Sequence, residues 1–307
     1  MSAGGTLVVG GGFVGTAVAR RLAERGEAVT VTSRRRPGHL PDTRGVRWQA
    51  LDATDAEACD RLSARLRPRR VVLVHGPSDV TWCEEHPERA VAAHTAAAAN
   101  LAAAAGDARL LMISTDNVFD GSRPGNTEDT PPSPANAYGR AKLRTEERLL
   151  GAAADVVVLR VSLVYGHEPA DAGKWLNFFA ACAHRLLRGE PVTAPHDQWT
   201  TPAHVDDVAE VTAAVLCTEA PVPPVLHLGG PDRVSRAAWA SVVAEEVGAP
   251  PQLVVPTPRA GTRYASRPEN TCLRSSLLGR LPATEAIAVR GVREGARSLA
   301  AAFGTEC

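Results

Sequence analysis

The stretch TLVVGGGFVG, residues 6–15, limits the folds open to this chain more than any other segment. A short β-branched run stops at three consecutive glycines and leads into TAVARRLAERG, whose apolar residues recur at helical spacing. Gly10, Gly12 and Gly15 thus form the pattern G-x-G-x-x-G between a strand and a helix. This context predicts a dinucleotide-binding turn, with a plain glycine turn as the alternative.

The alternation of strand and helix continues through the first half of the chain. Further strands are expected at 27–33, 70–76, 109–114 and 155–166, and long helices at 87–106 and 136–153. Strands that read as continuous apolar runs are typical of a parallel sheet covered on both faces. We therefore predict an α/β fold with a doubly wound, Rossmann-type parallel sheet.

The pattern changes after about residue 166, where Pro and Gly become frequent and short extended segments separate the helices. We expect a cofactor-binding domain at 1–165, with return segments from the C-terminal half, and a smaller mixed α/β substrate-binding domain at 166–307. Ligands of such open sheets bind over the carboxyl ends of the strands. The second domain is therefore expected to close over that edge.

Charge and composition exclude several classes of function. Lys plus Arg and Asp plus Glu both number 34, so no global basic field attracts nucleic acid or an anionic membrane. No apolar run approaches the roughly 20 residues of a membrane span, and the N-terminus lacks the order of a signal peptide. The six cysteines are scattered, and no His lies at metal-ligand spacing. We expect a cytoplasmic protein without a metal site.

The end of the second expected strand indicates which nucleotide is bound. Thr32 and Ser33 stand where an NAD site usually has an acidic residue, and three arginines at 34–36 follow. Guanidinium groups pair with a 2′-phosphate through charge-assisted hydrogen bonds, so NADP(H) is favoured over NAD(H). A solvated basic loop is the alternative. Asp52 would contact the adenine or cap the following helix.

Tyr138 and Lys142 form the pattern Y-x-x-x-K, one helical turn apart and therefore on one helix face. An ammonium beside a phenol lowers its pKa and favours proton exchange near neutral pH. Thr115, at the end of the preceding strand, offers a hydroxyl that would orient a substrate oxygen. The expected cofactor contacts are Gly10, Gly12, Phe13, Val14, Gly15, Ser33, Arg34, Arg35, Asp52, His75, Tyr138 and Lys142.

At this point the chain resembles the extended short-chain dehydrogenase/reductases, and most closely the dTDP-4-dehydrorhamnose reductase family. The likeness rests on VTWCEEHPERAVAAHTAAAANLA, ISTDNVFDG, YGRAK, LRVSLVYG, NFF, TTPAHVDDVAE and RPENTCL. It implies catalytic places for Thr115, Tyr138 and Lys142, with Asp116 matching an acidic residue of the motif. It also implies substrate contacts for Asn117, Asn177, Arg267 and Asn270, and Trp199 either lines the sugar site or packs.

The resemblance implies NADPH-dependent reduction of a 4-keto group on a nucleotide-linked deoxysugar. Tyr138 would protonate the alkoxide, and Arg160 and Arg267 would bind the diphosphate, although Arg160 could equally be a structural arginine. A sugar-nucleotide epimerase with the same Tyr and Lys is one alternative, and a non-catalytic NADP-binding regulatory subunit is another. The Ala- and Arg-rich composition would suit secondary-metabolite, for example antibiotic, biosynthesis.

Two departures from the family pattern bear on the substrate. The glycine turn is tighter than the usual G-x-x-G-x-x-G, and Asn117 stands where these reductases usually have Tyr. Sugar-nucleotide 4,6-dehydratases carry Glu at that position, and Asn cannot act as their base. A dehydratase is therefore disfavoured. The small residues of the Ala-rich helix at 87–105 permit close packing against the sheet or across a homodimer.

Overall fold

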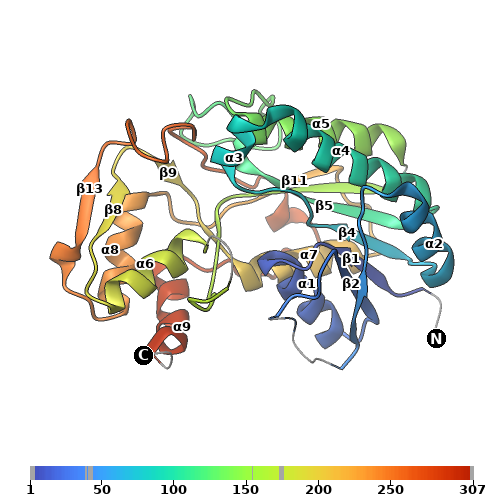
Figure 1. Cartoon of the computed structure of the whole chain (residues 1–307), viewed down its shortest axis with the longest axis horizontal. Helices are drawn as coiled ribbons and strands as arrows, with labels where there is room; N and C mark the ends of the chain where they lie inside the picture. The colour runs from blue at the N-terminus through green and yellow to red at the C-terminus, as the bar shows by residue number, and fades with distance from the viewer. Residues whose placement is uncertain (1–3, 39, 41–43, 154, 173–175, 305–307) are drawn as a thin grey trace.

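A seven-stranded parallel sheet forms the larger part of the molecule in the computed structural model, which describes residues 4–38, 40, 44–153, 155–172 and 176–304 (Figure 1). The strand order is β11-β6-β5-β4-β1-β2-β3. The strands are β1 Thr6–Val9, β2 Val29–Ser33, β3 Val46–Ala50, β4 Arg70–Leu73, β5 Arg109–Thr115, β6 Val156–Val161 and β11 Val225–Leu228. The order reverses between β1 and β4, as in doubly wound nucleotide-binding folds. The predicted fold class is confirmed.

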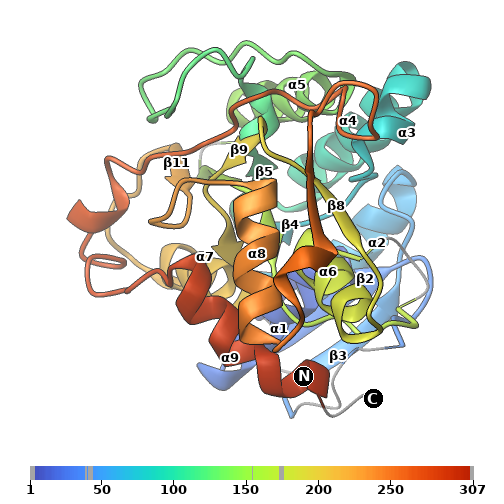
Figure 2. The ribbon, with the colours of Figure 1, turned by 90° about the vertical axis from the view of Figure 1, so that its left-hand side faces the viewer.

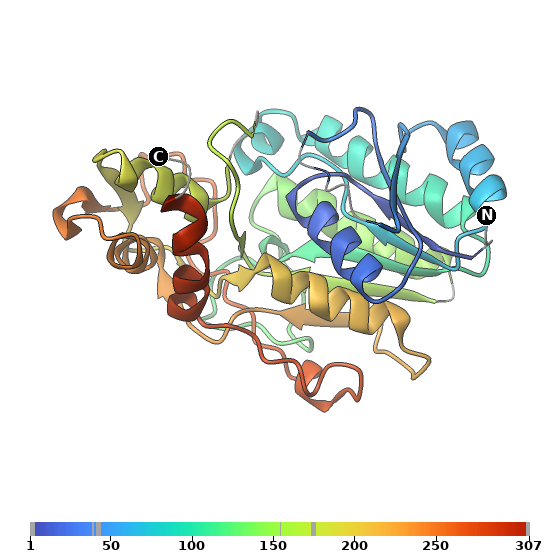
Figure 3. The same cartoon turned by 90° about the horizontal axis from the view of Figure 1, so that it is seen from below.

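Helices cover both faces of this sheet, because its strands bury apolar side chains on both sides. Leu7 and Val9 pack toward α2 (Ala56–Leu66), α4 (Pro87–Ala104) and α5 (Ala137–Ala152). Val8, between them, joins the core beneath α1 (Phe13–Glu24) and α7 (Val205–Cys217), which lie side by side in Figure 3. Alternate residues therefore face opposite helical layers, as strand geometry requires.

Short polar side chains set where several helices begin. Asp55 caps α2 by accepting from the Ala58 N–H, and Asp79 caps the short α3 (Val80–Glu85). Asp52 accepts instead from the backbone and hydroxyl of Thr54. The alternative that Asp52 caps the following helix is therefore wrong, because Asp55 occupies that position.

A second, smaller lobe lies at the carboxyl-end edge of the sheet and has its own aromatic core (Figures 1 and 2). Trp239, Tyr165, Phe179 and Phe303 are the largest fully buried side chains of this core. The elements of this C-terminal region are β7 Val164–Tyr165, α6 Phe178–Leu187, β8 Val192–Pro195, β9 Trp199–Thr200, β10 Ala203–His204, β12 Val234–Ser235, α8 Arg236–Glu246, β13 Val254–Thr257 and α9 Val292–Gly304, with 3-10 turns at Pro251–Leu253 and Leu278–Arg280. A further 3-10 turn, Asp116–Val118, directly follows β5 of the large sheet.

The chain returns to the sheet after the second lobe has begun. β11 pairs in parallel with β6, and α7 packs against α1. The Ala-rich helix α4 packs within the chain against α2 and α5, burying Ala97 and Ala98. Packing within the chain is thus one use of its small residues, and a homodimer stays a prediction. Within the described ranges, no helix is long and apolar enough to cross a membrane.

Candidate active site

The glycine turn links β1 to α1 at the point where the sheet order reverses. Gly10 has a φ of +120°, and a Cβ there would lie 2.4 Å from the Val74 carbonyl oxygen. A Cβ on Gly15 would collide with the Gly10 carbonyl oxygen at 1.8 Å, so only glycine lets α1 begin this close to the strand. Gly12, at the helix N-cap, faces open space, with no capping side chain and no acid in the first turn. The free N–H groups at this end therefore suit a phosphate.

The end of β2 presents an exposed basic loop beside this turn. Arg34, Arg35 and Arg36 are exposed, and none forms an ion pair with another residue in the part of the chain that the structure describes. Arg34 lies near enough to Asp52 to help lower the pKa of that carboxyl, whose main cause is hydrogen bonding from Thr54. The Ser33 hydroxyl donates to the Arg35 carbonyl oxygen at 2.6 Å and accepts from Trp48 Nε1. The loop's guanidinium groups stay available for an anion.

Thr115 ends β5 and starts the 3-10 turn Asp116–Val118. Its hydroxyl oxygen accepts from the Asn117 backbone N–H at 3.1 Å, and Thr115 lies near enough to Tyr138 to oppose the rise in the pKa of that phenol. Asp116 is buried, and burial raises its pKa to about 6 although Ser162, Thr115 and Asn117 all donate to it. The end of β5 therefore gathers a hydroxyl and a carboxyl beside the Tyr138 ring.

Three contacts fix the N-terminus of α5, and with it Tyr138. Asn136 caps the helix by accepting from the Gly139 N–H at 2.8 Å, and its amide donates to Asn117 Oδ1 at 2.8 Å. Glu84 accepts from the Ala137 N–H. A Cβ on Gly139 would lie 1.9 Å from the Asn117 carbonyl oxygen, so glycine allows the helix to touch the 3-10 turn. These contacts set the position of Tyr138 relative to Thr115.

Lys142 lies one turn along α5 and is buried, with its Nζ donating to the Ile113 carbonyl oxygen at 2.7 Å. Burial lowers its pKa to about 8, and Glu146 partly opposes this shift. The pKa of Tyr138 is raised, mainly by burial and next by the Asp116 carboxylate, while Thr115 acts in the other direction. The expected lowering by Lys142 is thus wrong for this arrangement, because desolvation and Asp116 dominate.

Two histidines lie behind this group. His75 follows β4 and contacts the His94 carbonyl oxygen through Nε2 at 3.2 Å, and the His94 and Tyr138 rings are 6.0 Å apart. Burial, with the nearby Lys142 charge, lowers the pKa of His75 to about 4 and that of His94 to about 3. Both rings are therefore neutral near pH 7 and line the wall beside Lys142.

The predicted substrate residues lie where the second lobe meets the end of β5. The backbones of Trp199 and Asn270 form an isolated parallel β-bridge, and the Arg233 Cζ lies 4.0 Å from the Trp199 ring centroid. Asn270 Oδ1 is buried without a hydrogen-bond donor among the described residues. Arg267 lies 5.3 Å from the Tyr264 ring centroid and donates to the Arg263 carbonyl oxygen. These side chains surround the same junction.

Asn117 is joined to that junction through Asn136, which also donates to the Ser266 carbonyl oxygen at 3.4 Å. The Asn117 amide donates to Asp116 at 2.8 Å. Asn177, by contrast, caps α6 and donates to Gly166 and Glu168. Its contact with substrate stays a prediction, because the side chain already serves this local role.

Arg160 does not reach the site, so the structural role is confirmed among the two that the sequence left open, and the diphosphate role is wrong. Its guanidinium donates to both oxygens of Glu146, with a closest distance of 2.7 Å, and both side chains are buried. Ser114 also donates to Glu146, and His227 lies on the far side of the guanidinium. The pair joins β6 to α5 and is therefore unavailable to a diphosphate.

Asn136, Gly139, Glu146 and Ser162 were not singled out from sequence as residues that support the site. An Asn directly before the helix beginning at Ala137 is an N-cap signal that could have identified Asn136. Ser162 donates to Asp116 at 3.1 Å across two strands, a contact with no sequence signal.

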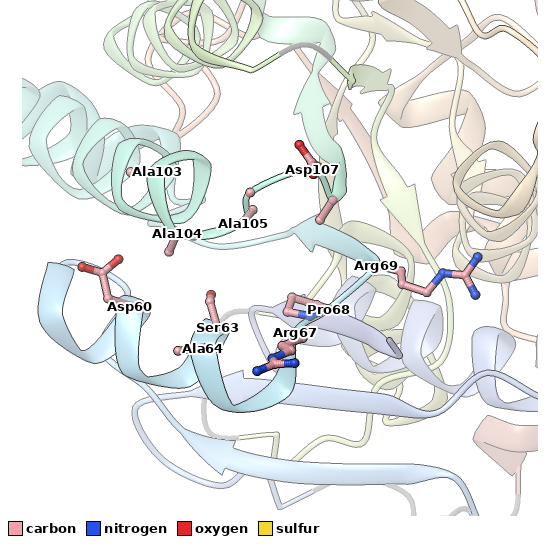
Figure 4. Close-up of a pocket in the computed structure, with 12 residues that line it drawn as sticks. Asp60, Ser63, Ala64, Arg67, Pro68, Arg69, Ala103, Ala104, Ala105 and Asp107 are labelled. Atoms are coloured by element: carbon pink, nitrogen blue, oxygen red, sulfur yellow. The ribbon is translucent and has the colours of Figure 1, made fainter. Parts of the chain in front are cut away.

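A surface hollow of about 580 Å³ lies at the opposite edge of the sheet (Figure 4). Its wall includes Asp60, Arg67 and Arg69, near the end of α2 and the start of β4. Because ligands of doubly wound sheets bind over the carboxyl ends of the strands, this hollow is not the substrate site.

The sheet order, the glycine turn and the Tyr138–Lys142 face beside Thr115 define a nucleotide-dependent oxidoreductase of the extended short-chain dehydrogenase/reductase class. A family model described as the RmlD substrate binding domain matches residues 5–301. The chain belongs to this family, which confirms the resemblance read from its motifs.

Curated relatives include reductases and a subunit of a methionine adenosyltransferase. The chain is 32% identical to the dTDP-4-dehydrorhamnose reductase of Mycolicibacterium smegmatis, covering 86% of this chain and 76% of the relative. It is 31% identical to a probable low-salt glycan biosynthesis reductase of Haloferax volcanii, over 85% and 86%. It is also 31% identical to methionine adenosyltransferase 2 subunit beta of Danio rerio, over 64% and 62%.

Solved structures share the fold. A UDP-glucose 4-epimerase of Thermus thermophilus, in complex with NAD, superposes with a TM-score of 0.82 at 25% identity, covering 98% of this chain and 99% of that one. A dTDP-4-dehydrorhamnose reductase of Bacillus anthracis, in complex with NADP, has a TM-score of 0.77 at 20% identity, over 96% and 98%. The fold is thus common to reductases and epimerases of nucleotide sugars.

Proposed function

We propose that this chain uses NADPH to reduce the 4-keto group of a nucleotide-linked deoxysugar. The observation that carries the proposal is that Thr115 lies near enough to Tyr138 to act on the pKa of its phenol, with Lys142 buried one helical turn away. The named reductases at 31% and 32% identity support this chemistry. The identity of the sugar, a role in secondary metabolism and a cytoplasmic location stay predictions.

The residues of the site divide the work of reduction. Tyr138 donates its proton to the ketone oxygen as the carbonyl carbon is reduced, and Thr115 holds that oxygen by a hydrogen bond. The raised pKa of Tyr138 keeps it protonated near pH 7, which suits an acid. In the protein alone burial and Asp116 dominate the Tyr138 pKa, and we propose that the Lys142 charge offsets part of this effect as the tyrosinate forms.

The glycine turn and the basic loop fit NADP(H), which would supply the hydride. The free helix end at Gly12 suits the pyrophosphate, and Arg34 and Arg35 suit the 2′-phosphate. His75 lies at the adjacent strand end, beside Lys142. The fold alone accommodates either nicotinamide cofactor, so this basic loop is the feature that favours NADPH.

An epimerase and a non-catalytic subunit are the competing functions. An epimerase would convert a nucleotide sugar without consuming cofactor, and a relative with that fold is solved with NAD. A regulatory subunit would bind NADPH without turnover, and the relative from Danio rerio is named as a subunit. The presence of Thr115, Tyr138 and Lys142 together favours an enzyme over a non-catalytic subunit.

One experiment separates these functions. The protein is incubated with a 4-keto dTDP-deoxysugar and NADPH, and cofactor oxidation is followed by absorbance and product by mass spectrometry. We expect stoichiometric oxidation, with the Tyr138→Phe variant slower by roughly 10²- to 10⁴-fold while still binding NADPH. Conversion of a nucleotide sugar without cofactor consumption would support the epimerase, and binding without turnover the subunit.

A further inference from the structure

Arg236, the first residue of α8, is a buried arginine in the second lobe. Its side chain is only 6% exposed. Its Nε donates to Gln198 Oε1 at 2.5 Å, and its backbone N–H donates to the Gln198 carbonyl oxygen at 3.1 Å. Gln198 is itself buried and donates to the Pro268 carbonyl oxygen. Two hydrogen bonds to the buried Gln198 therefore fix the position of Arg236.

Two aromatic rings flank the guanidinium. Its Cζ lies 4.9 Å from the Phe178 ring centroid and 4.7 Å from that of Tyr264. Both rings are buried, and such contacts stabilise a desolvated cation without neutralising it. Because a rigid guanidinium between two rings loses little freedom when it binds, the arrangement is pre-organised for a planar or tetrahedral anion.

Arg236 has no carboxylate partner within ion-pair distance among residues 4–38, 40, 44–153, 155–172 and 176–304. Burial lowers its pKa to about 10, and the nearby Arg267 acts in the same direction. The group thus stays charged near pH 7 in a place that disfavours charge. A buried cation without a counter-ion destabilises a fold unless an anion binds it.

A second guanidinium shares the Tyr264 ring with Arg236. The Arg267 Cζ lies 5.3 Å from the Tyr264 ring centroid, and Arg263, at 4.9 Å from the same centroid, donates to the Tyr264 hydroxyl. The Asp116 charge also acts on Arg236, so this carboxyl at the end of β5 lies within electrostatic range of the guanidinium. The segment that holds it, Gln198–Thr200, reaches Ser162 and then Asp116 through hydrogen bonds. Arg236 is therefore connected to the end of β5 through Gln198, the segment that follows it and Ser162.

We propose that Arg236, held by Gln198 and flanked by Phe178 and Tyr264, binds the diphosphate of the substrate together with Arg267. This inference rests on the proposed function and names the group of the nucleotide sugar that the second lobe recognises. Two guanidinium forks match two phosphoryl groups, and each forms short charge-assisted hydrogen bonds. Arg236 would thus determine specificity for nucleoside diphosphates over monophosphates and nucleosides.

The test measures binding of dTDP, UDP and thymidine to the full chain by calorimetry, with saturating NADP+ present to occupy the cofactor site. We expect Arg236→Met to weaken dTDP and UDP binding by roughly 10- to 100-fold and to leave thymidine binding unchanged. Arg236→Lys keeps the charge but not the fork and should fall between. Arg297→Met, which alters an exposed arginine of α9 in the same lobe, is the matched control.

Thermal unfolding without ligand distinguishes this binding role from a structural one. Because Arg236→Met removes a buried charge without a counter-ion, its melting temperature should equal or exceed that of the unchanged protein. A large fall in melting temperature, with diphosphate binding intact, would contradict the proposal. So would weaker NADP+ binding in Arg236→Met with dTDP binding unchanged, which would assign Arg236 to the cofactor.

Failure of the reductase proposal would be visible separately. If the unchanged protein binds dTDP through Arg236 but reduces no 4-keto sugar, the diphosphate site stands and the reaction is wrong. If it reduces the sugar while Arg236→Met binds dTDP normally, the reaction stands and the diphosphate site is wrong.

Discussion

The sheet half of the molecule and the second lobe differ in whether their buried charged side chains have partners within the protein. In the sheet half, Arg160 is paired with Glu146, and Asp116 receives hydrogen bonds from three side chains. In the second lobe, Arg236 has rings and an amide around it but no described carboxylate in ion-pair distance. The first arrangement is complete within the protein, whereas the second has charge left over for a ligand.

This difference assigns separate tasks to the two regions. Satisfied polar networks fix geometry, as proton transfer among Thr115, Tyr138 and a substrate oxygen requires. An uncompensated cation gives binding energy only when an anion arrives, so the substrate's charged part contributes most where the protein lacks a counter-charge. The two proposals together thus place chemistry on the sheet and recognition on the second lobe.

The largest expected effect breaks the complete pair. Glu146→Gln leaves Arg160 buried without its counter-charge, and we expect a loss of about 3–5 kcal/mol in the free energy of unfolding. Urea denaturation measures it, with Glu57→Gln as control, because that exposed pair on α2 should contribute less than about 1 kcal/mol. An equal, small effect in both variants would remove the contrast with Arg236.

A smaller effect is expected from adding one methyl group where α5 touches the 3-10 turn. In Gly139→Ala the new Cβ meets the Asn117 carbonyl oxygen, so Tyr138 shifts relative to Thr115 and kcat should fall about 10²-fold. Gly151→Ala, near the end of the same helix, has no atom within 4 Å of its Cβ and should keep full activity. Steady-state kinetics compare them; unchanged kcat in Gly139→Ala would show that this contact does not position Tyr138.

The exposed basic loop should have a still smaller effect, because solvent screens its charges. Replacing Arg34 and Arg35 together by Ala should weaken NADPH binding by about tenfold and leave NADH binding unchanged. Arg61→Ala, on the exposed face of α2, is the control. Fluorescence titration of both cofactors measures the ratio, and an equal loss for NADH would assign the loop to the shared part of the dinucleotide.

The pH dependence sharpens the role of Lys142. Its pKa is lowered from 10.5 to about 8, so the ammonium is lost as pH rises through 8, and kcat/KM for reduction should fall about tenfold per pH unit above that value. The His75 ring is already neutral well below pH 8, so its titration does not change the profile near that pH. A level profile across pH 8 in substrate reduction would mean that the charge of Lys142 is not required.

The sequence predicted most of the sheet half, because the apolar runs of its strands and the helical spacing of apolar residues between them are both clear there. The glycine turn, the end of β5 at Thr115 and the Y-x-x-x-K face each depend on a few adjacent residues. The structural role of Arg160 was left open, since its partner lies on another element fourteen positions away. Burial that raises the Tyr138 pKa cannot be seen without the packing around it.

The second lobe was less predictable, for a physical reason. Arg236 and Arg267 both lie over the Tyr264 ring. The two-residue strands β9 and β12 pair there, and the segment at 267–271 lies beside them. Strands this short carry no measurable alternation of apolar residues. Contacts that arise from irregular segments far apart in the chain have no local sequence signal.

Isotope transfer tests the proposed reaction most directly. The protein is given a 4-keto dTDP-deoxysugar and NADPH deuterated at C4 of the nicotinamide, in each of its two stereoisomers, and the product is examined by mass spectrometry and NMR. We expect deuterium at C4 of the sugar from one of the two isomers, with loss of turnover in Tyr138→Phe. A product without deuterium from either isomer, or no product from a protein that binds both ligands, would contradict the reductase proposal.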